Sequence, residues 1–595
     1  MRFQSKEAAG YQVFAIAGVN TISFGIQASA AARKGLLGFA VERFDPTENE
    51  RSFMPGFKVF RSLVPHPDKR TRVSTWDHPI QSFVWDDFTA KPDRQYEYFF
   101  YPVKGTPKHL DRGTTPFKVR VRTEPLFSTQ EHDVFFNRGV ASSQAYALRF
   151  GNHKPDDLPA AKRVEALQWL TRELDDAILR FISHAQSNDT LLCCFYEFRY
   201  LPVAKALKAA ITRGVDVQLI VDAKVNGTKV KGKLQPSFPR EENLKTIKAA
   251  GIPMKRVQLR EARASSIQHN KFMVLLKGGQ KPSEVWTGST NISLGGLAGQ
   301  TNVGHWVRNA ALARSYKEYW DLLNTDPGGT ANDSASDVKT KNAAFRAAVE
   351  ALQGAPTSMA AIPAGVTPVF SPRAGLQVLD LYVKLLDSSQ QSAAAITLAF
   401  GINKAFKDQL KDNTAQSHII FMLLEKKDAP NPKSQEAFVA INASNNVYKA
   451  WGAFIQDPIY QWTRETNARL LALNQHVSYV HSKFLLMDPL GDDPIVVTGS
   501  ANFSAASTND NDENMLLIRG SRRVADLYFT EFNRLFNHYY FRAVTEERHD
   551  AGKKPDDASL FLLETDQWID KYAPGKLRAK RLALYTGMKG AVSDT

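Results

Sequence analysis

Cysteine is nearly absent from this chain of 595 residues, which contains only two. Cys193 and Cys194 are adjacent within Thr190–Tyr196, an apolar run with the length and composition of a buried strand. A disulfide framework needs several separated cysteines, and a structural zinc site needs more ligands at closer spacing. The scarcity excludes a disulfide-stapled scaffold and predicts two inert, buried thiols, with neither a metal nor a cofactor expected.

Long apolar runs are also missing, because no segment approaches the roughly 18 uncharged apolar residues that a transmembrane helix needs. Arg2 and Lys6 precede the apolar stretch Tyr11–Ile26, but Asn20 and Ser23 interrupt it. This pattern favours strands over a cleaved signal peptide. We expect no transmembrane segment, and the cytoplasm or export without a classical signal fits better than signal-peptide secretion. The compartment itself stays open.

Acidic residues are outnumbered, since 61 Asp and Glu stand against 76 Lys and Arg, giving a net charge of +15. This excess favours an anionic partner such as nucleic acid, an acidic membrane surface or a phosphorylated substrate. The hydrophobic content of 43% is ordinary for a globular protein. The length predicts two or three domains.

The first 125 residues have short β-rich runs separated by Pro and Gly. In Phe117–Arg122, apolar and basic residues alternate, as in a strand with one buried and one solvated face. The segment around Tyr96 and Tyr98 is similar to a late strand of fibronectin or immunoglobulin-like domains. We expect residues 1–125 to form an all-β, sandwich-like accessory domain of unknown role, followed by a linker at 126–159.

From about residue 160 the pattern changes to alternating helices and strands, and it occurs twice. The expected elements of the first copy are Val164–Ile182, Thr190–Tyr196, Pro202–Thr212 and Val215–Val221, and those of the second are Leu376–Leu386, Ala394–Phe400, Lys404–Leu410 and Ile419–Leu424. We therefore expect two related half-domains at 160–325 and 373–545. A linker or lid at 326–372 and a polar, basic tail at 546–595 complete the division.

Each copy contains the same short cassette. The first is His269-Asn270-Lys271 followed by Gly288-Ser289-Thr290-Asn291, and the second is His481-Ser482-Lys483 followed by Gly499-Ser500-Ala501-Asn502. The distance from His to Gly is 19 positions in the first copy and 18 in the second. A single His-x-Lys or Gly-Ser-x-Asn carries little information, but two of each in one order and at matching distance indicate one shared site.

These residue types suit the cleavage of a phosphodiester. On a strand, the His and Lys of His-x-Lys point to the same face and can meet one ligand. Ammonium, amide and hydroxyl donors stabilise the charge that develops on the non-bridging oxygens. One imidazole can attack phosphorus while the other donates a proton to the leaving oxygen and later activates water, and this chemistry requires no metal.

The second cassette, with Asp488 five positions past Lys483, resembles the His-x-Lys-x4-Asp signature of the phospholipase D superfamily. The resemblance covers roughly residues 160 to 545. It implies an α/β fold in which two α/β/α half-domains form one two-lobed catalytic unit, so that a monomer suffices for a complete active site. It further implies that His269 is the nucleophile and His481 the general acid. The phosphate ligands that it implies are Lys271, Lys483, Ser289, Asn291, Ser500 and Asn502.

The first cassette departs from the family pattern, because Leu276 stands at the position that matches Asp488. The second copy also has Glu513, where the family often carries an acidic residue, and the first copy has Gln300-Thr301-Asn302 at that place. In this family the motif carboxylate helps to fix the orientation and tautomer of an imidazole. We therefore expect asymmetric histidines, with Asp488 or Glu513 as a catalytic partner that supports one of them.

Three functions remain open at this stage. Within the family that this chain resembles, fused two-cassette chains of this size more often act on lipids. By this resemblance, hydrolysis or transfer of a phospholipid headgroup is favoured. The alternatives are a nuclease with the same two-histidine chemistry and an inactive module that binds an anionic ligand. The basic stretch Lys576–Arg581 suits peripheral contact with an acidic membrane or a solvated tail. Hydrolysis versus transfer and the oligomeric state stay undecided.

Overall fold

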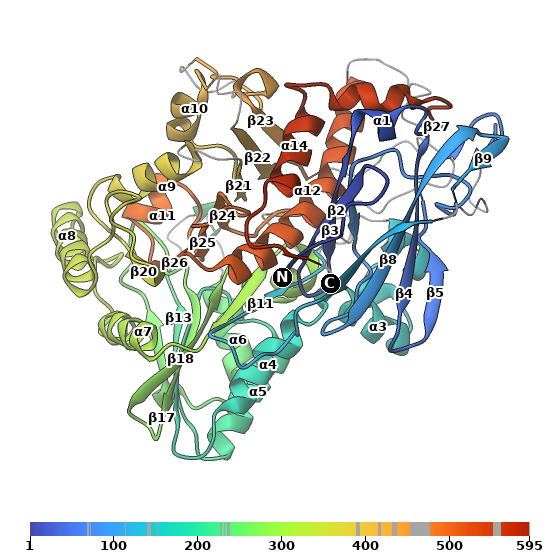
Figure 1. Cartoon of the computed structure of the whole chain (residues 1–595). Helices are drawn as coiled ribbons and strands as arrows, with labels where there is room; N and C mark the ends of the chain where they lie inside the picture. Colours follow the sequence, from blue (N-terminus) through green and yellow to red (C-terminus); the bar gives the residue numbers. More distant parts are fainter. Residues whose placement is uncertain are drawn as a thin grey trace.

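The structure is a computed structural model, and it describes residues 1–56, 58–67, 71, 73–113, 115–139, 144–151, 153–225, 229–230, 233–234, 239–387, 393–413, 418–430, 437–452, 477–550 and 561–593. An N-terminal β-sandwich, drawn in blue in Figure 1, lies beside two α/β lobes. We call residues 132–352 the first lobe and residues 365–550 the second lobe.

The N-terminal sandwich consists of two mainly antiparallel sheets. The strands of one sheet are, in order, β28 (Val592–Ser593), β1 (Arg2–Gln4), β2 (Tyr11–Ala17), β3 (Ile22–Ala28) and β7 (Val84–Asp87). The other contains β10 (Phe117–Arg122), β8 (Gln95–Thr106), β4 (Gly38–Asp45) and β5 (Glu50–Phe53), with β9 (His109–Asp111) paired to β8. In β10, alternate residues are buried and exposed, as the sequence pattern predicts.

The expected polar tail is in fact part of this sandwich, which corrects the boundary drawn at residue 546. Strand β28 pairs in parallel with β1, and β27 (Phe561–Leu562) pairs with β6 (Val59–Phe60). Between them, the 3-10 segment η5 (Asp566–Tyr572) buries Trp568 in the sandwich core. Helix α14 (Leu577–Thr586) also packs against β3, so most of the basic stretch Lys576–Arg581 lies within a docked helix. The tail folds here because its apolar residues fill the sandwich core.

Each lobe is built around a seven-stranded sheet, and the two sheets have the same strand order. The first contains β11 (His132–Phe136), β19 (Val303–Val307), β18 (Lys281–Gly288), β17 (Lys271–Lys277), β12 (Thr190–Phe195), β13 (Asp216–Asp222) and β16 (Val257–Arg260). The second contains β20 (Gly365–Ser371), β26 (Glu513–Arg519), β25 (Ile495–Gly499), β24 (Phe484–Met487), β21 (Ala393–Leu398), β22 (Ile419–Leu424) and β23 (Val447–Trp451). The expected duplication is therefore present strand by strand.

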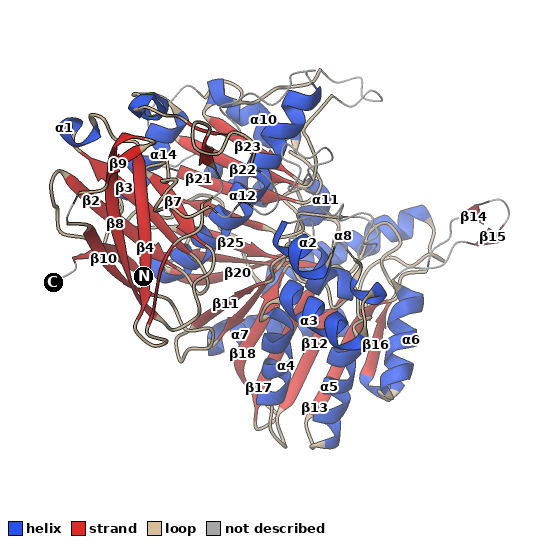
Figure 2. Ribbon diagram, turned by 90° about the vertical axis from the view of Figure 1, so that its right-hand side faces the viewer, coloured by secondary structure: helices blue, strands red, loops and turns tan. Residues whose placement is uncertain are grey.

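Helices cover both faces of each sheet, as Figure 2 shows. The outer face of the first sheet packs against α4 (Leu174–His184), α5 (Leu201–Thr212) and α6 (Arg240–Ala250). The second sheet packs its outer face against α9 (Gln377–Asp387) and α10 (Lys404–Leu410). Central strands such as β12 and β22 are buried throughout, which explains their continuous apolar sequences.

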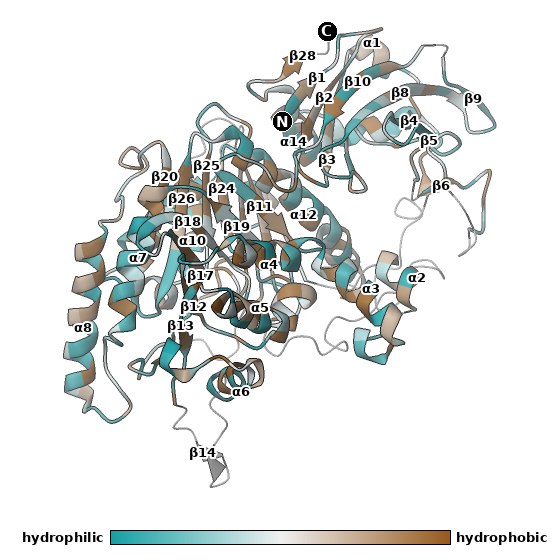
Figure 3. Ribbon diagram, turned by 90° about the horizontal axis from the view of Figure 1, so that it is seen from below, coloured by the Kyte–Doolittle hydropathy of each residue, from teal (hydrophilic) through white to brown (hydrophobic). Residues whose placement is uncertain are grey.

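The inner faces of the two sheets share one hydrophobic core with α7 (Ala310–Asn324) and the long helix α12 (Arg522–Asp550). Phe484 of β24 contacts both Phe136 of β11 and Tyr528 of α12. In Figure 3, strands of the lobes such as β12 and β13 are coloured mainly hydrophobic. Since each lobe buries its inner face against the other, the two lobes form one folded unit.

Both segments expected to be linkers contain edge strands, because each sheet needs a seventh strand from outside the repeated core. Within 126–159, β11 pairs with β19; this segment also holds α2 (Gln144–Phe150) and the short η1 (Pro155–Asp157). Within 326–372, β20 pairs with β26, and α8 (Ala335–Leu352) forms a helix of 18 residues. The expected helix Val164–Ile182 is divided by Arg172 into α3 (Ala160–Thr171) and α4.

The remaining elements are short. They are α1 (Ala30–Arg33), β14 (Lys229–Val230), β15 (Lys233–Leu234), η2 (Met254–Arg256), the π-helical η3 (Gly295–Gly299), η4 (Ala443–Asn445) and α11 (Ala505–Asn509). No helix in the described ranges combines the length and apolarity that crossing a bilayer requires.

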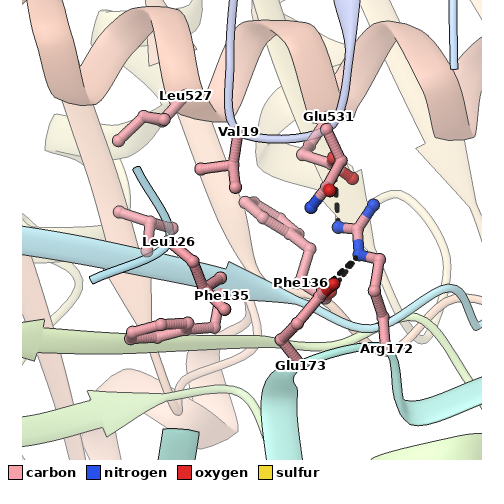
Figure 4. A pocket seen from close by; sticks show the side chains of 10 residues that line it. Val19, Leu126, Phe135, Phe136, Arg172, Glu173, Leu527 and Glu531 are labelled. Carbon is pink, nitrogen blue, oxygen red and sulfur yellow. Dashed lines mark hydrogen bonds and ion pairs between the residues drawn. The ribbon is translucent and has the colours of Figure 1, made fainter. Parts of the chain in front are cut away.

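A buried ion pair joins the lobes where the sandwich meets them. Figure 4 shows the small cavity at this junction, between Val19 of the sandwich and Leu527 of α12. Arg172 lies 3.1 Å from the carboxylate of Glu531 and donates a hydrogen bond to the carbonyl of Phe136. Burial raises the pKa of Glu531, but Arg172 and a second arginine on α12 outweigh it and lower that pKa to about 2. The charge pair therefore fixes α12 against the first lobe.

Candidate active site

The two cassettes occupy equivalent places in the two sheets and meet across the lobe boundary. In each, the His precedes a strand that pairs with an interior strand of the same sheet, β17 with β12 and β24 with β21. The backbone N–H of His269 donates to the carbonyl of Asp512, 2.9 Å away, and that of His481 donates to the carbonyl of Thr301 at 3.2 Å. Each histidine is therefore anchored to the opposite lobe.

Close packing explains the glycine that begins each Gly-Ser-x-Asn. A Cβ atom on Gly288 would lie 2.3 Å from the carbonyl oxygen of Val303, and one on Gly499 would lie 2.2 Å from that of Asn514. Any side chain would separate these strands, so only glycine fits.

His269 is held by a carboxylate from the second lobe. Its Nδ1 lies 2.9 Å from both carboxylate oxygens of Glu513, and both side chains are buried. Burial raises the pKa of Glu513, but its interaction with His269, which includes the hydrogen bond, and the charge of Lys271 outweigh burial and hold that pKa below its usual value. Because an ionised carboxylate only accepts hydrogen bonds, the proton lies on Nδ1, and Nε2 is the nitrogen that can react with a substrate.

His481 is held in the same way by an amide from the first lobe. Its Nδ1 lies 2.9 Å from Oδ1 of Asn302, whose Nδ2 donates to the carbonyl of Gly296 at 2.7 Å. The amide oxygen must therefore accept, which again places the ring proton on Nδ1. Asn302 follows Ser289 by 13 positions, as Glu513 follows Ser500. The two imidazole partners are thus equivalent residues that differ in charge.

Both imidazoles are neutral at rest near pH 7. Burial lowers the pKa of His269 to about 4, although the charge of Glu513 opposes the shift. Burial and the neighbouring Lys483 and Lys271 lower the pKa of His481 well below its usual value. Asn302 carries no charge, so it provides no carboxylate that would favour an imidazolium at His481.

The motif serines support these partners, and their expected role as phosphate ligands stays a prediction. Ser289 Oγ donates to Oδ1 of Asn302 at 2.8 Å, and Ser500 Oγ donates to Oε2 of Glu513 at 2.6 Å. Each hydroxyl also accepts a backbone N–H of the neighbouring strand. Their hydrogen-bonding capacity is therefore used in orienting the groups that orient the imidazoles.

Lys271 and Lys483 are buried beside the histidines. Nζ of Lys271 lies 2.5 Å from the carbonyl of His269, and Nζ of Lys483 lies 2.6 Å from that of His481. Burial lowers the pKa of Lys271 to about 8, although Glu513 and Glu197 oppose the shift. Burial and the charge of Lys271 lower the pKa of Lys483 well below its usual value. A bound anion would relieve both penalties.

A cavity of about 430 Å³ lies between the lobes and is lined by both histidines. Asn291 and Asn502 also line it, and their buried Oδ1 atoms have no hydrogen-bond partner within the described structure. Tyr196, which belongs to neither motif, also lines the cavity, with its ring centroid 5.0 Å from that of His269. Its only sequence signal is its place just after β12, at the edge where both histidines lie.

Asp488 lies at the other end of its strand, which corrects its expected role as a partner of an imidazole. The four residues of β24 separate it from Lys483, and an extended strand of that length spans roughly 13 Å. Its backbone N–H donates to the carbonyl of Ala393, and its φ of 43° places it in a turn. The imidazole partners are Glu513 and Asn302 instead. Within the described part of the chain, no three His, Cys, Asp or Glu side chains cluster closely enough to hold a metal ion.

Comparison with known families finds one match that covers both cassettes. The sequence matches the family described as "Cardiolipin synthase, PLD-like domain" over residues 178–323 and 382–536, about half of the chain. No curated protein sequence matches the chain at a significant level.

Comparison with solved structures finds partial similarities. The phosphatidylserine synthase of Haemophilus influenzae Rd KW20 is 12% identical over 70% of this chain and 93% of its own, with a TM-score of 0.41. The polyphosphate kinase of Porphyromonas gingivalis is 12% identical over 58% of this chain, with a TM-score of 0.36, and the chain covers only 42% of that kinase. The phospholipase D family member Nuc from Salmonella typhimurium is 25% identical over 25% of this chain and 84% of its own, with a TM-score of 0.19.

Proposed function

The chain belongs to the phospholipase D-like family, and we propose that it hydrolyses or transfers the headgroup phosphodiester of a phospholipid through a phosphohistidine intermediate. Enzymes of this superfamily are generally phosphodiesterases or phosphotransferases. The observation that carries the proposal is the pair of buried imidazoles, each held at Nδ1, that line one cavity. Two imidazoles in one cavity provide both a nucleophile and a general acid.

In the first step, Nε2 of His269 attacks phosphorus, and the bond from phosphorus to the leaving oxygen breaks. His481, protonated at Nε2 once the anionic substrate is bound, gives that proton to the leaving oxygen. The phosphorylated ring of His269 carries positive charge, and Glu513 stabilises that charge through Nδ1–H at 2.9 Å. Asn302 provides no such charge to His481, which remains a strong proton donor.

The two lysines and two asparagines act on the non-bridging oxygens. Lys271 and Lys483 supply positive charge from buried positions, where electrostatic interactions are stronger than in water. The amide groups of Asn291 and Asn502 line the same cavity and add hydrogen-bond donors once the Nδ2 atoms face the phosphate. The two lysines are buried beside the histidines before the reaction, so little reorganisation is needed apart from turning the two amides.

In the second step, His481 accepts a proton from water, or from an alcohol in a transfer reaction. The resulting oxygen nucleophile attacks phosphorus and the bond to Nε2 of His269 breaks, which frees His269 and leaves His481 protonated. When the anionic product leaves, His481 releases that proton to solvent and the resting enzyme is restored. His481 thus changes from acid to base between the steps.

The cavity wall supports a lipid as the substrate. Apolar side chains of Ile267, Phe400 and Val477 line the cavity together with Tyr196. Phe400 is 61% exposed, although it belongs to this wall, so an aromatic ring faces solvent beside the cavity. Such a wall suits a glycerolipid next to its headgroup phosphate better than a second phosphate of a nucleic-acid backbone.

The test uses the full chain on both substrate classes. Vesicles of phosphatidylcholine and phosphatidylethanolamine, incubated in EDTA, should release choline or ethanolamine, and plasmid DNA should remain intact under the same conditions. Degraded plasmid beside intact lipid would make the enzyme a nuclease. His269→Ala and His481→Ala should each reduce turnover at least about 1,000-fold. If neither substrate is cleaved and both variants still bind phosphate, the chain is a binding module.

The roles of the histidines are tested with a lipid analogue that carries a 4-nitrophenyl leaving group, which needs no acid. In His481→Ala, acid-labile 32P-labelled phosphohistidine should accumulate because the base of the second step is missing. Label found in His269→Ala instead would assign the nucleophile to His481.

A further inference from the structure

A carboxylate of the first lobe binds the backbone just before His269. Asp222 is the last residue of β13, and its Oδ2 accepts the backbone N–H of Gln268 at 3.0 Å. Its Oδ1 accepts the backbone N–H of Lys224 at 3.3 Å. Asp222 is fully buried, and each of its two carboxylate oxygens accepts a hydrogen bond from a backbone N–H. Gln268 immediately precedes the histidine.

A carboxylate of the second lobe binds the backbone just before His481. Glu425 directly follows β22, and its Oε2 accepts the N–H groups of Tyr479 and Val480 at 2.9 and 2.7 Å. Its Oε1 accepts the N–H of Ser478 at 2.8 Å. Val480 immediately precedes the histidine, as Gln268 does in the first lobe.

The two carboxylates occupy equivalent places in the duplicated fold. β13 pairs in parallel with β12, and β22 pairs in parallel with β21, which occupies the same place in the second sheet. At both sites the residue before the histidine donates to a carboxylate of its own lobe, and the histidine N–H donates to a carbonyl of the other lobe. Two consecutive N–H groups thus fix each histidine between the lobes.

We propose that Asp222 and Glu425 are positioning residues for catalysis, which hold the backbone of His269 and His481 at the separation that the two-step reaction needs. The proposal rests on the function proposed above. A carboxylate is suited to this role because each of its oxygens accepts, and its charge strengthens bonds to backbone N–H groups. An error of about 1 Å in the placement of a reacting group can cost about 100-fold in rate.

The carboxylates also act differently on the lysines. Burial lowers the pKa of Lys271, and Glu513 and Glu197 oppose that shift. Asp222 adds a smaller opposing effect in its ionised form, which predominates on the alkaline side because burial raises the pKa of Asp222 to about 7. The carboxylate influence on Lys483 comes from Glu513, against burial and Lys271. Loss of the charge at residue 222 should therefore make Lys271 lose its proton at lower pH, and loss of the charge at residue 425 should not.

The experiment compares Asp222→Asn and Glu425→Gln with wild type in the full chain. Each replacement keeps the shape but leaves one acceptor oxygen and places an NH2 group against a backbone N–H. We expect kcat for bis(4-nitrophenyl) phosphate to fall about 10- to 100-fold with KM within about threefold. In Asp222→Asn alone, the alkaline limb of the kcat/KM profile should also move to lower pH.

Asp189→Asn is the matched control. Asp189 is also buried and accepts backbone N–H groups, from Gln186 and Gly278. It lies just before β12, however, at the end of the strands away from Asp222 and His269. It should destabilise the fold by a similar amount and leave kcat per folded molecule within about twofold. An equal loss of kcat in this control would reduce the effect to general destabilisation and overturn the proposal.

Crystal structures of both variants separate this proposal from the proposed function. Asp222→Asn should displace the backbone at His269 and leave that at His481 in place, and Glu425→Gln should do the reverse. Undisplaced histidines would refute the positioning role, even in an active enzyme. A wild-type protein that cleaves neither lipid, DNA nor the nitrophenyl ester would refute the enzyme function, while the displacements would still decide the anchoring role.

Discussion

The two lobes share a seven-strand order and a cassette, but they give each other different groups. The first lobe receives the carboxylate of Glu513 for His269, and the second lobe receives the amide of Asn302 for His481. Everything that places these groups is duplicated, including the glycine, the serine and the 13-residue spacing. The charge of the imidazole partner therefore distinguishes the two otherwise equivalent halves, and each half supplies this partner to the histidine of the other.

This exchange separates the roles of the two histidines. A carboxylate next to His269 stabilises the positive charge of a phosphorylated ring. An uncharged amide next to His481 fixes the tautomer without stabilising an imidazolium, so that ring releases its proton easily. A duplicated fold can thus give a nucleophile and an acid from two histidines by pairing one with a carboxylate and the other with an amide.

Removing the charge difference at Glu513 should have the largest effect. In Glu513→Gln the amide still fits beside His269 and Ser500, but the phosphorylated ring loses its counter-charge. We expect kcat to fall about 100- to 1,000-fold, the loss that follows removal of one preorganised electrostatic partner. Steady-state hydrolysis of phosphatidylcholine vesicles measures it, and a variant within threefold of wild type would show that the charge is dispensable.

The lysines of the two lobes should differ in their response to alkali. Lys271 has three acidic neighbours and a pKa of about 8, whereas Lys483 has fewer and lies beside Lys271. A lysine with a lowered pKa is charged below that pKa and loses its charge above it. We expect kcat/KM to fall about tenfold between pH 8 and pH 9 as phosphate binding weakens.

A pH profile of kcat/KM, with circular dichroism at each pH, tests this alkaline fall in activity, called the alkaline limb above. An activity that stays constant to pH 10 while the fold persists would contradict it. Lys271→Arg, with a side chain that stays protonated, should lose activity overall but move the limb toward higher pH.

Much of the frame was predictable because its signals are local. The limits of β10, α10 and β22 agree with the apolar periodicity of the sequence. The placement of β28 beside β1 was not predictable, because it joins the two ends of the chain. Loops and tails carry no periodic signal that identifies a distant partner, and this is why the tail and both linkers were divided wrongly.

The site was predictable as a set of residues but not as a set of contacts. Repetition indicates both His-x-Lys pairs, and the family resemblance indicates Glu513. The exchange of partners between lobes was not predictable, since no local pattern says that His269 meets Glu513 and not Asp488. The equal spacing of Asn302 and Glu513 from their serines was the available signal. It identifies the imidazole partners only when the backbone hydrogen bonds of each histidine to the other lobe are known.

Making the lobes alike should have a moderate effect. Asn302→Asp gives His481 a carboxylate, which raises its pKa and makes it a weaker acid. We expect hydrolysis of a lipid, whose leaving alcohol needs a proton, to slow about fivefold at pH 7, with the optimum moved to higher pH. A 4-nitrophenyl ester should form its intermediate at the wild-type rate, and equal slowing of both substrates would instead indicate a disturbed structure.

The smallest effect should come from Asp488, the one residue that makes the second motif look complete. The first lobe has Leu276 at the matching position, and both positions lie at the end of their strand away from the histidines. If the carboxylate of Asp488 took part in catalysis, the two lobes would differ in function at Asp488 and Leu276. Asp488 lies instead in a turn after β24, which gives it a structural role. Asp488→Asn should therefore keep kcat and KM within about twofold and lower the free energy of unfolding by about 1 kcal/mol. Urea unfolding measures the free energy of unfolding, and steady-state kinetics measure kcat and KM on the same preparation. A loss of kcat beyond tenfold in a stably folded variant would show that Asp488 takes part in catalysis. The lobes would then differ in function at Asp488 and Leu276.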